Sequence, residues 1–310
     1  MNIQQLEYII AVDQCRHFAR AAEVCCVTQP TLSMMIQKLE EELGVKIFDR
    51  AKHPVEPTAI GKRIIDQAQI SLRHLHQIRE MVESEQDVVK GSFHMGIIPT
   101  IATYLVPALL DKQHDIGFEL ILKESTTNQL VDNILNGTMD GGILAGPLRH
   151  PAITEYPVYY EKFYAYVSPH DEAHKKKVID LNKVDINDMW LLENEHCLRG
   201  QIERLCRLKK KSAATAPAVK YESGSIETLI NVVDSNSGIT IIPEMHAMAL
   251  NEEKQENLRT LQHTAVREVC LITGKDYVRK TMLQMIMEIV KNAVPKSMQD
   301  ASLKAYVVDL

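Results

Sequence analysis

The hydrophobic pattern of this 310-residue chain changes character near residue 91, and this change limits its fold more than any other feature. Before that point, apolar residues recur at helical spacing. Beyond it, short apolar runs alternate with helical segments: we expect strands at 93–98, 118–123 and 142–145 and helices at 99–110 and 128–135. This alternation is typical of a mostly parallel sheet with helices on both faces. The sequence therefore predicts an all-α N-terminal part followed by an α/β part.

A second α/β unit is predicted after residue 166, with a helix at 226–233 and a strand at 238–242. The chain then returns to the first unit near 266–273 and ends in a helix around 282–294, followed by a loosely attached tail. We therefore expect four parts: 1–60, a linker helix and hinge at 61–90, an α/β domain at 91–294 with 166–265 as its second subdomain, and the tail at 295–310.

Composition excludes several classes of protein. The length suggests about two domains, and 45% hydrophobic and 25% charged residues are ordinary for a globular protein. The net charge of −6 gives no basic signature. The N-terminus lacks the plan of a signal peptide, and no apolar run approaches the roughly 18 residues that span a bilayer. Six scattered cysteines do not form a secreted disulfide framework, so we expect a cytoplasmic protein without membrane contact.

Residues 1–60 are predicted to form short helices around one tight turn. A compact helix at 18–23 and a turn at 24–27 precede a helix that begins at Gln29 and ends before Gly44. Thr28 and Pro30 stand where an N-cap and an early-helix proline are favoured. Two helices across a four-residue turn predict a helix-turn-helix, whose second helix can enter the major groove of double-stranded DNA.

The second helix is polar at its N-terminal end, and residues 46–60 are predicted to form a small wing with a basic tip. Polar side chains can read base edges, whereas basic ones contact phosphates. The predicted base contacts are Thr28, Gln29, Thr31, Ser33, Gln37 and Lys38, and the predicted phosphate contacts are Arg50 and Lys52.

One long helix is predicted from about residue 59 to residue 83, before a polar hinge at 84–91. Its apolar residues lie close to a heptad stripe, which a dimer seam needs. The stripe consists of Ile64, Ala68, Leu75, Ile78 and Val82. The alternative is a helix that lies on its own domain.

The run 191–201 ends in His-Cys-Leu-Arg-Gly-Gln, and a further thiol follows at Cys206. Cys197 is flanked by His196 and Arg199, and cations stabilise a thiolate over a thiol. A thiolate attacks peroxide, and a second thiol lets the resulting sulfenic acid condense to a disulfide. Spacing alone proves little here, because six cysteines make fifteen pairs.

The segment between these two thiols is predicted to be helical when reduced, because Leu198, Ile202 and Leu205 recur at helical spacing. A helix rises about 1.5 Å per residue, which holds the Cα atoms of Cys197 and Cys206 roughly 13 Å apart. A disulfide needs these atoms within about 7 Å. The helix must therefore unwind for the bond to close.

The segments 18–23, 28–33, 36–45 and 48–50, closing with Thr58 and Gly61, resemble in order the N-terminal domain of LysR-type transcriptional regulators. The resemblance implies a winged helix-turn-helix, a dimerising linker helix and a periplasmic-binding-protein-like effector domain. It also implies a homotetramer built from two dimers, with DNA and RNA polymerase as partners. Met34 departs from the pattern, since many members carry arginine there.

Within that family, the effector half resembles members that sense hydrogen peroxide, in segments 96–100, 127–130, 196–199, 225–229 and 237–240 and at Gln201 and Cys206. The resemblance implies that Cys197 is the peroxidatic cysteine, Cys206 the resolving one, and a cellular thiol the reductant. It places Thr100, Thr127, His196 and Arg199 around the peroxide. Gly200 departs from the acidic residue usual there.

The sequence thus predicts a redox-responsive DNA-binding regulator, not an enzyme, without a cofactor. The residues Cys15, His17, Cys25 and Cys26 lack the paired spacing of a metal site. Two alternatives stay open. One is a LysR-type regulator whose effector-domain cleft binds a small organic ligand, with Thr100 and Thr127 holding its carboxylate. The other is a thiol peroxidase or Cys-His hydrolase on a DNA-binding arm.

Overall fold

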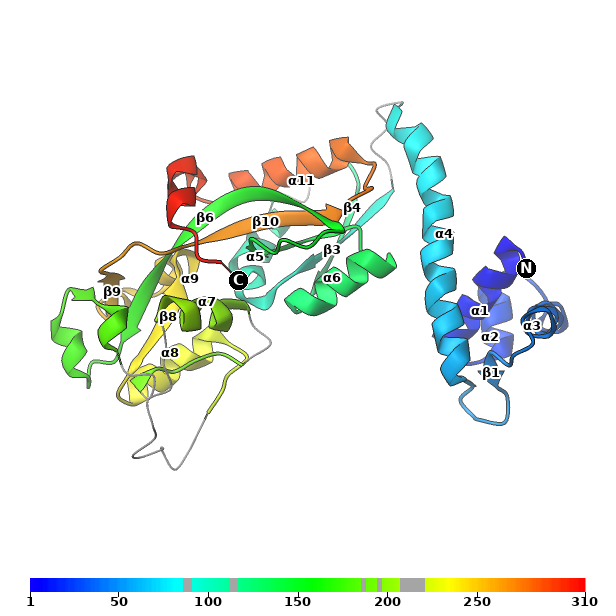
Figure 1. The fold of residues 1–310 in the computed structure, drawn as a ribbon, viewed down its shortest axis with the longest axis horizontal. Helices are drawn as coiled ribbons and strands as arrows, with labels where there is room; N and C mark the ends of the chain where they lie inside the picture. The colour runs from blue at the N-terminus through cyan, green and yellow to red at the C-terminus, as the bar shows by residue number, and fades with distance from the viewer. Residues whose placement is uncertain (86–90, 112–115, 185–187, 194–196, 207–220, 310) are drawn as a thin grey trace. The chain divides into compact units, whose positions relative to one another are not determined.

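The computed structural model describes residues 1–85, 91–111, 116–184, 188–193, 197–206 and 221–309. The chain divides into two compact units (Figure 1). The first is formed mainly by the N-terminal part through helix α4 (Ala59–Glu85), and the second by the part from strand β3 (Ser92–Ile97) onward. Each unit has its own hydrophobic core.

The first unit is the predicted winged helix-turn-helix. Helices α1 (Ile3–Cys15), α2 (Phe18–Val24) and α3 (Gln29–Leu43) are followed by strands β1 (Phe48–Asp49) and β2 (Glu56–Pro57), which pair antiparallel and form the wing. Thr28 caps α3 by accepting a hydrogen bond from the Thr31 amide at 3.4 Å. Gly44 closes the helix at φ +70°, a backbone conformation that glycine adopts without strain.

A buried carboxylate ties the wing to α3. Glu40 is 2% exposed, and its Oε1 accepts hydrogen bonds from the backbone amides of Ile47 at 2.8 Å and Phe48 at 3.3 Å. Its other oxygen pairs with Lys46 and Arg50 at 3.3 and 3.5 Å. These contacts satisfy the charge of a carboxylate that burial would otherwise penalise.

The apolar stripe of α4 divides into two parts. Ala68 is 3% exposed and packs into the core of the first unit. This part of the helix lies on its own domain, which was the alternative to a dimer seam. Leu75 and Ile78 are 40% and 59% exposed. The side chain of Val82 lies outside the described residues. Only the C-terminal part of the stripe is therefore open to a second helix.

The second unit contains an α/β fold with two lobes. The first lobe holds β3, β4 (Glu119–Glu124) and β5 (Gly141–Gly146), with helices α5 (Pro99–Asp111), α6 (Thr127–Asn136) and α11 (Lys280–Asn292). The second holds β7 (Val178–Ile179), β8 (Ile239–Pro243) and β9 (Leu258–Leu261), with α7 (Cys197–Leu205), α8 (Ile226–Ser235), α9 (Glu244–Ala249) and α10 (Glu252–Gln255).

The parallel pairing expected for the strands at 93–98, 118–123 and 142–145 is confirmed, but two long antiparallel strands join the lobes and make the whole sheet mixed. Strand β6 (Ile153–Val167) pairs antiparallel with β10 (Val266–Gly274) along its first part and with β8 and β9 along its second. Figure 1 shows β6 and β10 side by side. The parallel pairs of the first lobe are β3 with β4 and β3 with β5. The predicted return of the chain near 266–273 is confirmed, because β10 pairs with β5.

The tail is docked, so the expectation of loose attachment is wrong. Two short 3-10 turns, Lys296–Gln299 and Ala301–Tyr306, bury Met298 and Leu303. Val307 then forms a parallel bridge with Val266. Burial of these two apolar side chains stabilises the attachment. No helix among the described residues is long and apolar enough to cross a membrane.

Candidate functional site

Cys197 lies where the two lobes meet, at the first residue of α7. Its half-buried side chain packs against the core of the first lobe, whereas the next residue, Leu198, is buried in the core of the second. The helix that follows is formed as predicted, with Ile202 also buried. All six cysteines are free thiols. Any change in the length or direction of α7 therefore acts on both lobes.

The cation of this site is Arg267, which the sequence analysis missed. Its side chain is fully buried on β10, and its Nε donates to Oε2 of Glu161 at 2.8 Å. Its Nη1 donates to the hydroxyl of Thr100 at 3.1 Å, and its Nη2 to the Thr100 carbonyl at 3.2 Å. Two charged residues inside the apolar run 265–272 were the signal that could have revealed it.

The electrostatics at Cys197 combine opposing effects. Burial raises the pKa of the Cys197 thiol above its usual value. The charge of Arg267, the hydroxyl of Thr127 and hydrogen bonds with the backbone of Leu198 and Ala145 lower this pKa, though not enough to cancel the effect of burial. The resting group is therefore a protonated thiol at neutral pH, and Arg267 with the hydrogen-bond donors offsets part of the cost of forming the thiolate.

Two hydroxyls that were predicted from sequence are present at this site. Thr127 begins α6, and its Oγ1 is buried without a partner at ordinary hydrogen-bond distance among the described residues. Thr100 is 6% exposed, and its hydroxyl oxygen accepts from Arg267, which leaves the hydroxyl proton free to be donated. The site thus has two hydroxyls, one that interacts with the Cys197 sulfur and one whose oxygen accepts from Arg267.

Arg199, which we expected to act as a cation beside the thiol, is paired with other groups. Its Nε pairs with Glu203 at 3.0 Å, and its Nη1 pairs with Glu222 at 2.6 Å and donates to the carbonyl of Leu192 at 2.9 Å. Two carboxylates neutralise its charge, and Arg267 is the cation that lowers the pKa of Cys197. His196 lies outside the described residues.

Cys206 follows the last residue of α7 and is 5% exposed in the core of the second lobe. Burial raises the pKa of its thiol to about 12, and its Sγ lies 3.6 Å from the sulfur of Met189. The two predicted redox thiols therefore stand at opposite ends of a formed helix. A Cβ atom added at Gly200 would meet no atom within 4 Å. Packing therefore does not explain why this chain has glycine where an acidic residue is usual.

A cavity of about 210 Å³ shares Thr100 with this site. It is lined by Pro99, Thr100, Thr103, Glu124, Gly224, Ser225, Ile226, Glu227 and His246. Burial and the charge of Arg267 lower the pKa of His246 to about 3, so this side chain is neutral. Two carboxylates and a neutral histidine are poor partners for a ligand carboxylate, and Thr127 is not in the lining. The geometry does not favour the organic-acid alternative.

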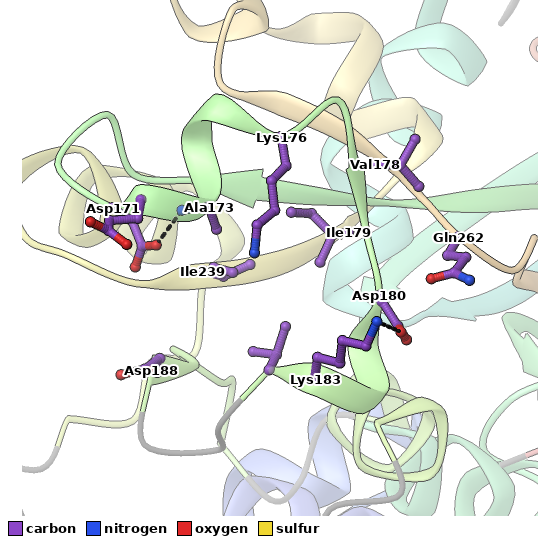
Figure 2. A pocket seen from close by; sticks show the side chains of 12 residues that line it. Asp171, Ala173, Lys176, Val178, Ile179, Asp180, Lys183, Asp188, Ile239 and Gln262 are labelled. Atoms are coloured by element: carbon purple, nitrogen blue, oxygen red, sulfur yellow. Dashed lines mark hydrogen bonds and ion pairs between the residues drawn. The ribbon is translucent and has the colours of Figure 1, made fainter.

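A larger cavity, of about 400 Å³, lies in the second lobe between β7 and the turns around it (Figure 2). Lys183 and Asp180 pair across 3.3 Å at its edge, and Lys176, Asp188 and Gln262 also line it. None of the predicted site residues takes part, so this cavity is separate from the thiol site. The described residues contain no group of three or more histidine, cysteine or acidic side chains placed to hold a metal.

The predicted DNA contacts lie on α3 and the wing. Thr28, Gln29, Thr31, Gln37 and Lys38 are exposed, and Ser33 is half-buried. Four of these residues already have side-chain partners: the hydroxyls of Thr28 and Thr31 lie 2.8 Å apart, Gln37 donates to Glu41 at 2.9 Å, and Ser33 accepts from Arg50. Met34 is 50% exposed on the same helix.

The two wing cations are also engaged within the protein. Arg50 donates to the hydroxyl of Ser33 at 3.0 Å and lies over the ring of Phe18, with 5.0 Å to the centroid. Lys52 pairs with Glu56 at 2.6 Å. Arg50 therefore connects the wing to α2 and α3 as well as standing at the surface.

Comparisons with known proteins agree with both units. The model for the bacterial regulatory helix-turn-helix protein, lysR family, matches residues 3–62, and the LysR substrate binding domain matches residues 86–295. The "Hydrogen peroxide-inducible genes activator" of Haemophilus influenzae is 34% identical over 84% of this chain and 85% of its own length. The "DNA-binding transcriptional dual regulator OxyR" of Escherichia coli K12 is 34% identical over 83% of each chain.

Solved structures give the same result. A full-length cysteine-to-aspartate variant of OxyR from Pseudomonas aeruginosa is 29% identical and covers 94% of this chain and 98% of its own, with a TM-score of 0.74. OxyR from Porphyromonas gingivalis is 30% identical over 67% of this chain and 94% of its own, with a TM-score of 0.61. The chain belongs to the LysR family of bacterial helix-turn-helix regulators. Within that family it resembles the OxyR proteins.

Proposed function

We propose that the protein is a hydrogen-peroxide-responsive transcription regulator whose signal is a disulfide between Cys197 and Cys206. The observation that supports this most is the placement of Cys197 near a buried guanidinium, that of Arg267, and two hydroxyls, those of Thr127 and Thr100. The similarity to hydrogen peroxide-inducible genes activators supports the same stimulus.

The chemistry has two steps. The thiolate sulfur of Cys197 attacks one oxygen of peroxide, the O–O bond breaks, and the departing oxygen takes a proton to leave as water. The hydroxyls of Thr127 and Thr100 can donate to that oxygen, and Arg267 stabilises its charge. The thiol of Cys206 then attacks the sulfenic sulfur, the S–O bond breaks, and a second water leaves. One peroxide is consumed, and two thiols become a disulfide that a cellular thiol reduces back.

The second step requires α7 to unwind, because its length keeps the two thiols too far apart to bond. Leu198 and Ile202, both fully buried, then leave their places in the second-lobe core. A local covalent event thus becomes a change of packing that can alter subunit contacts and DNA binding. We propose a homo-oligomer, a dimer of dimers, that binds DNA through α3 and acts on RNA polymerase.

The test compares two reagents on the same protein. Iodoacetamide should label exposed Cys26 first, because alkylation follows access. Brief treatment with dilute peroxide should instead oxidise Cys197 first, because the site around it supplies donors to the departing oxygen. Non-reducing peptide mapping should then show the Cys197–Cys206 link.

Two variants and a control make this test specific. Cys206→Ser should keep sulfenic acid formation at Cys197 and lose the disulfide, whereas Cys197→Ser should lose both. Cys270→Ser removes another buried thiol and should change neither result. Equal oxidation of all six thiols would exclude the proposal. Sustained peroxide turnover with a reductant, beyond one peroxide per chain and cycle, would favour the peroxidase alternative.

A further inference from the structure

The C-terminal segment contacts both elements that carry the thiol site. Gln201 stands one helical turn after Cys197 on α7, is fully buried, and donates from its Nε2 to the carbonyl of Val308 at 3.3 Å. The amide of the same residue, Val308, donates to the carbonyl of Val266 at 2.9 Å. Val266 directly precedes Arg267 on β10. One residue near the end of the chain therefore bridges the cysteine helix and the arginine strand.

The apolar contacts of the C-terminal segment are also divided between the second-lobe core and the β10 side. Val308 packs against the second-lobe core, to which Leu198 and Ile202 of α7 belong. Val307 packs with Tyr160, Val266 and Leu303 on the other side. A further contact is an ion pair between Arg149 and Asp309 at 2.7 Å, whose side chains are 72% and 51% exposed. Exposed pairs of this kind contribute little, so burial of Leu303 and the contacts of Val307 and Val308 hold the segment.

We propose, resting on the proposed function, that residues 301–309 form a redox-controlled latch, docked while α7 is helical and released when the Cys197–Cys206 disulfide unwinds it. Unwinding moves Gln201 away from Val308 and withdraws Leu198 and Ile202 from the second-lobe core, against which Val308 packs. Gln201 also carries a buried Oε1 without a partner among the described residues. This oxygen is unsatisfied in the docked state, and water can hydrogen-bond to it once α7 unwinds, which favours release.

The coupling acts in both directions. If the disulfide loosens the segment, then loosening the segment must favour the disulfide by the same factor, because linked equilibria are reciprocal. The latch therefore sets how readily the thiol pair is oxidised. The reduction potential of the thiol pair can therefore report on the latch. A residue that acted only on the rate of peroxide attack would not change this potential, because the potential is an equilibrium property.

The first experiment is hydrogen exchange on the full chain, followed in the peptide that contains Val308. The thiol form should protect this amide through its bond to Val266, and the disulfide form should not. In the thiol form, Gln201→Met should speed exchange about five- to tenfold, the factor expected for one lost hydrogen bond. Gln299→Met is the control, because it removes the bonds of an exposed side-chain amide to the carbonyls of Lys291 and Val294, away from α7. It should leave the Val308 amide unchanged.

The second experiment measures the reduction potential of the thiol pair. Gln201→Met should make it about 20–30 mV more negative, which corresponds to a five- to tenfold change in the equilibrium constant. Gln299→Met should not shift it. A disulfide that forms while Val308 stays protected would overturn the latch and leave the proposed function intact. Absence of the disulfide after peroxide would defeat both, and unchanged exchange in Gln201→Met would defeat the latch alone.

Discussion

Arg267 donates from its Nε to Oε2 of Glu161 at 2.8 Å, and the two side chains are 0% and 1% exposed. The residues face each other across the antiparallel pair of β10 and β6. Two charges out of water are tolerated because each satisfies the other, and Thr100 takes two further donors of the guanidinium. The pair thereby holds a permanent cation next to Cys197 without contact with solvent.

Removal of the carboxylate charge of Glu161 tests how much its pair with Arg267 stabilises the protein. Glu161→Gln should lower the free energy of unfolding by about 3–5 kcal/mol, because it leaves a buried guanidinium without a counterion. Glu203→Gln is a suitable control, since its pair with Arg199 is 44% exposed on the glutamate side and should contribute less than about 1 kcal/mol. Urea unfolding followed by circular dichroism measures both. Equal losses in the two variants would show that Glu161 has no special role.

The pH dependence of Cys197 alkylation distinguishes the effect of Arg267 on this thiol from that of Arg199. Its pKa lies above the usual value, so its thiolate fraction should rise about tenfold per pH unit and continue to rise past pH 9. Without Arg267 the pKa should rise further, which moves the profile to higher pH. Arg199→Met should leave the profile in place, because Glu203 and Glu222 already neutralise that charge.

The variant for this measurement is the double substitution Glu161→Met and Arg267→Met, because a buried pair replaced by apolar side chains leaves no uncompensated charge. Alkylation of Cys197, quantified by peptide mass spectrometry between pH 6 and pH 10, gives the profile. A larger shift in Arg199→Met than in the double variant would return the role of neighbouring cation to Arg199.

The helix-turn-helix, the long linker helix and the α7 helix could all be predicted from periodicity and capping residues, because these are local signals. The antiparallel crossing of β6 and β10 could not, since a buried strand reads the same in either direction. Thr100 and Thr127 were found through resemblance. Arg267 and Glu161 were missed because their pairing joins residues 106 positions apart, which no local pattern reveals.

The DNA contacts separate into those that read bases and those that also hold the fold. Thr31→Ala should weaken binding to the specific site by about 1–3 kcal/mol. Lys52→Ala should instead weaken binding to all sequences and reduce its salt dependence. Arg50→Ala should do the same and also lower the melting temperature of the first unit, because Arg50 contacts Ser33, Glu40 and Phe18.

Footprinting and salt titration measure the binding changes, and calorimetry measures the melting temperature. Glu23→Ala, at an exposed position of α2, serves as the control and should preserve specific binding. Unchanged protection in Thr31→Ala and Lys52→Ala together would place the interface elsewhere.

Two copies of the chain are expected to pair through the exposed part of the α4 stripe. Leu75 and Ile78 are exposed on this helix, while Ala68, earlier on the same stripe, is buried in its own unit. Burial of a leucine side chain at a helix seam stabilises the pair by about 1.5–3 kcal/mol, and a carboxylate there would instead be desolvated without a partner. Leu75→Glu should therefore give monomers or aggregates in light scattering. His74→Glu places the same charge on the adjacent, exposed position and should keep the oligomer. If both variants assemble as the parent protein does, the seam does not include Leu75.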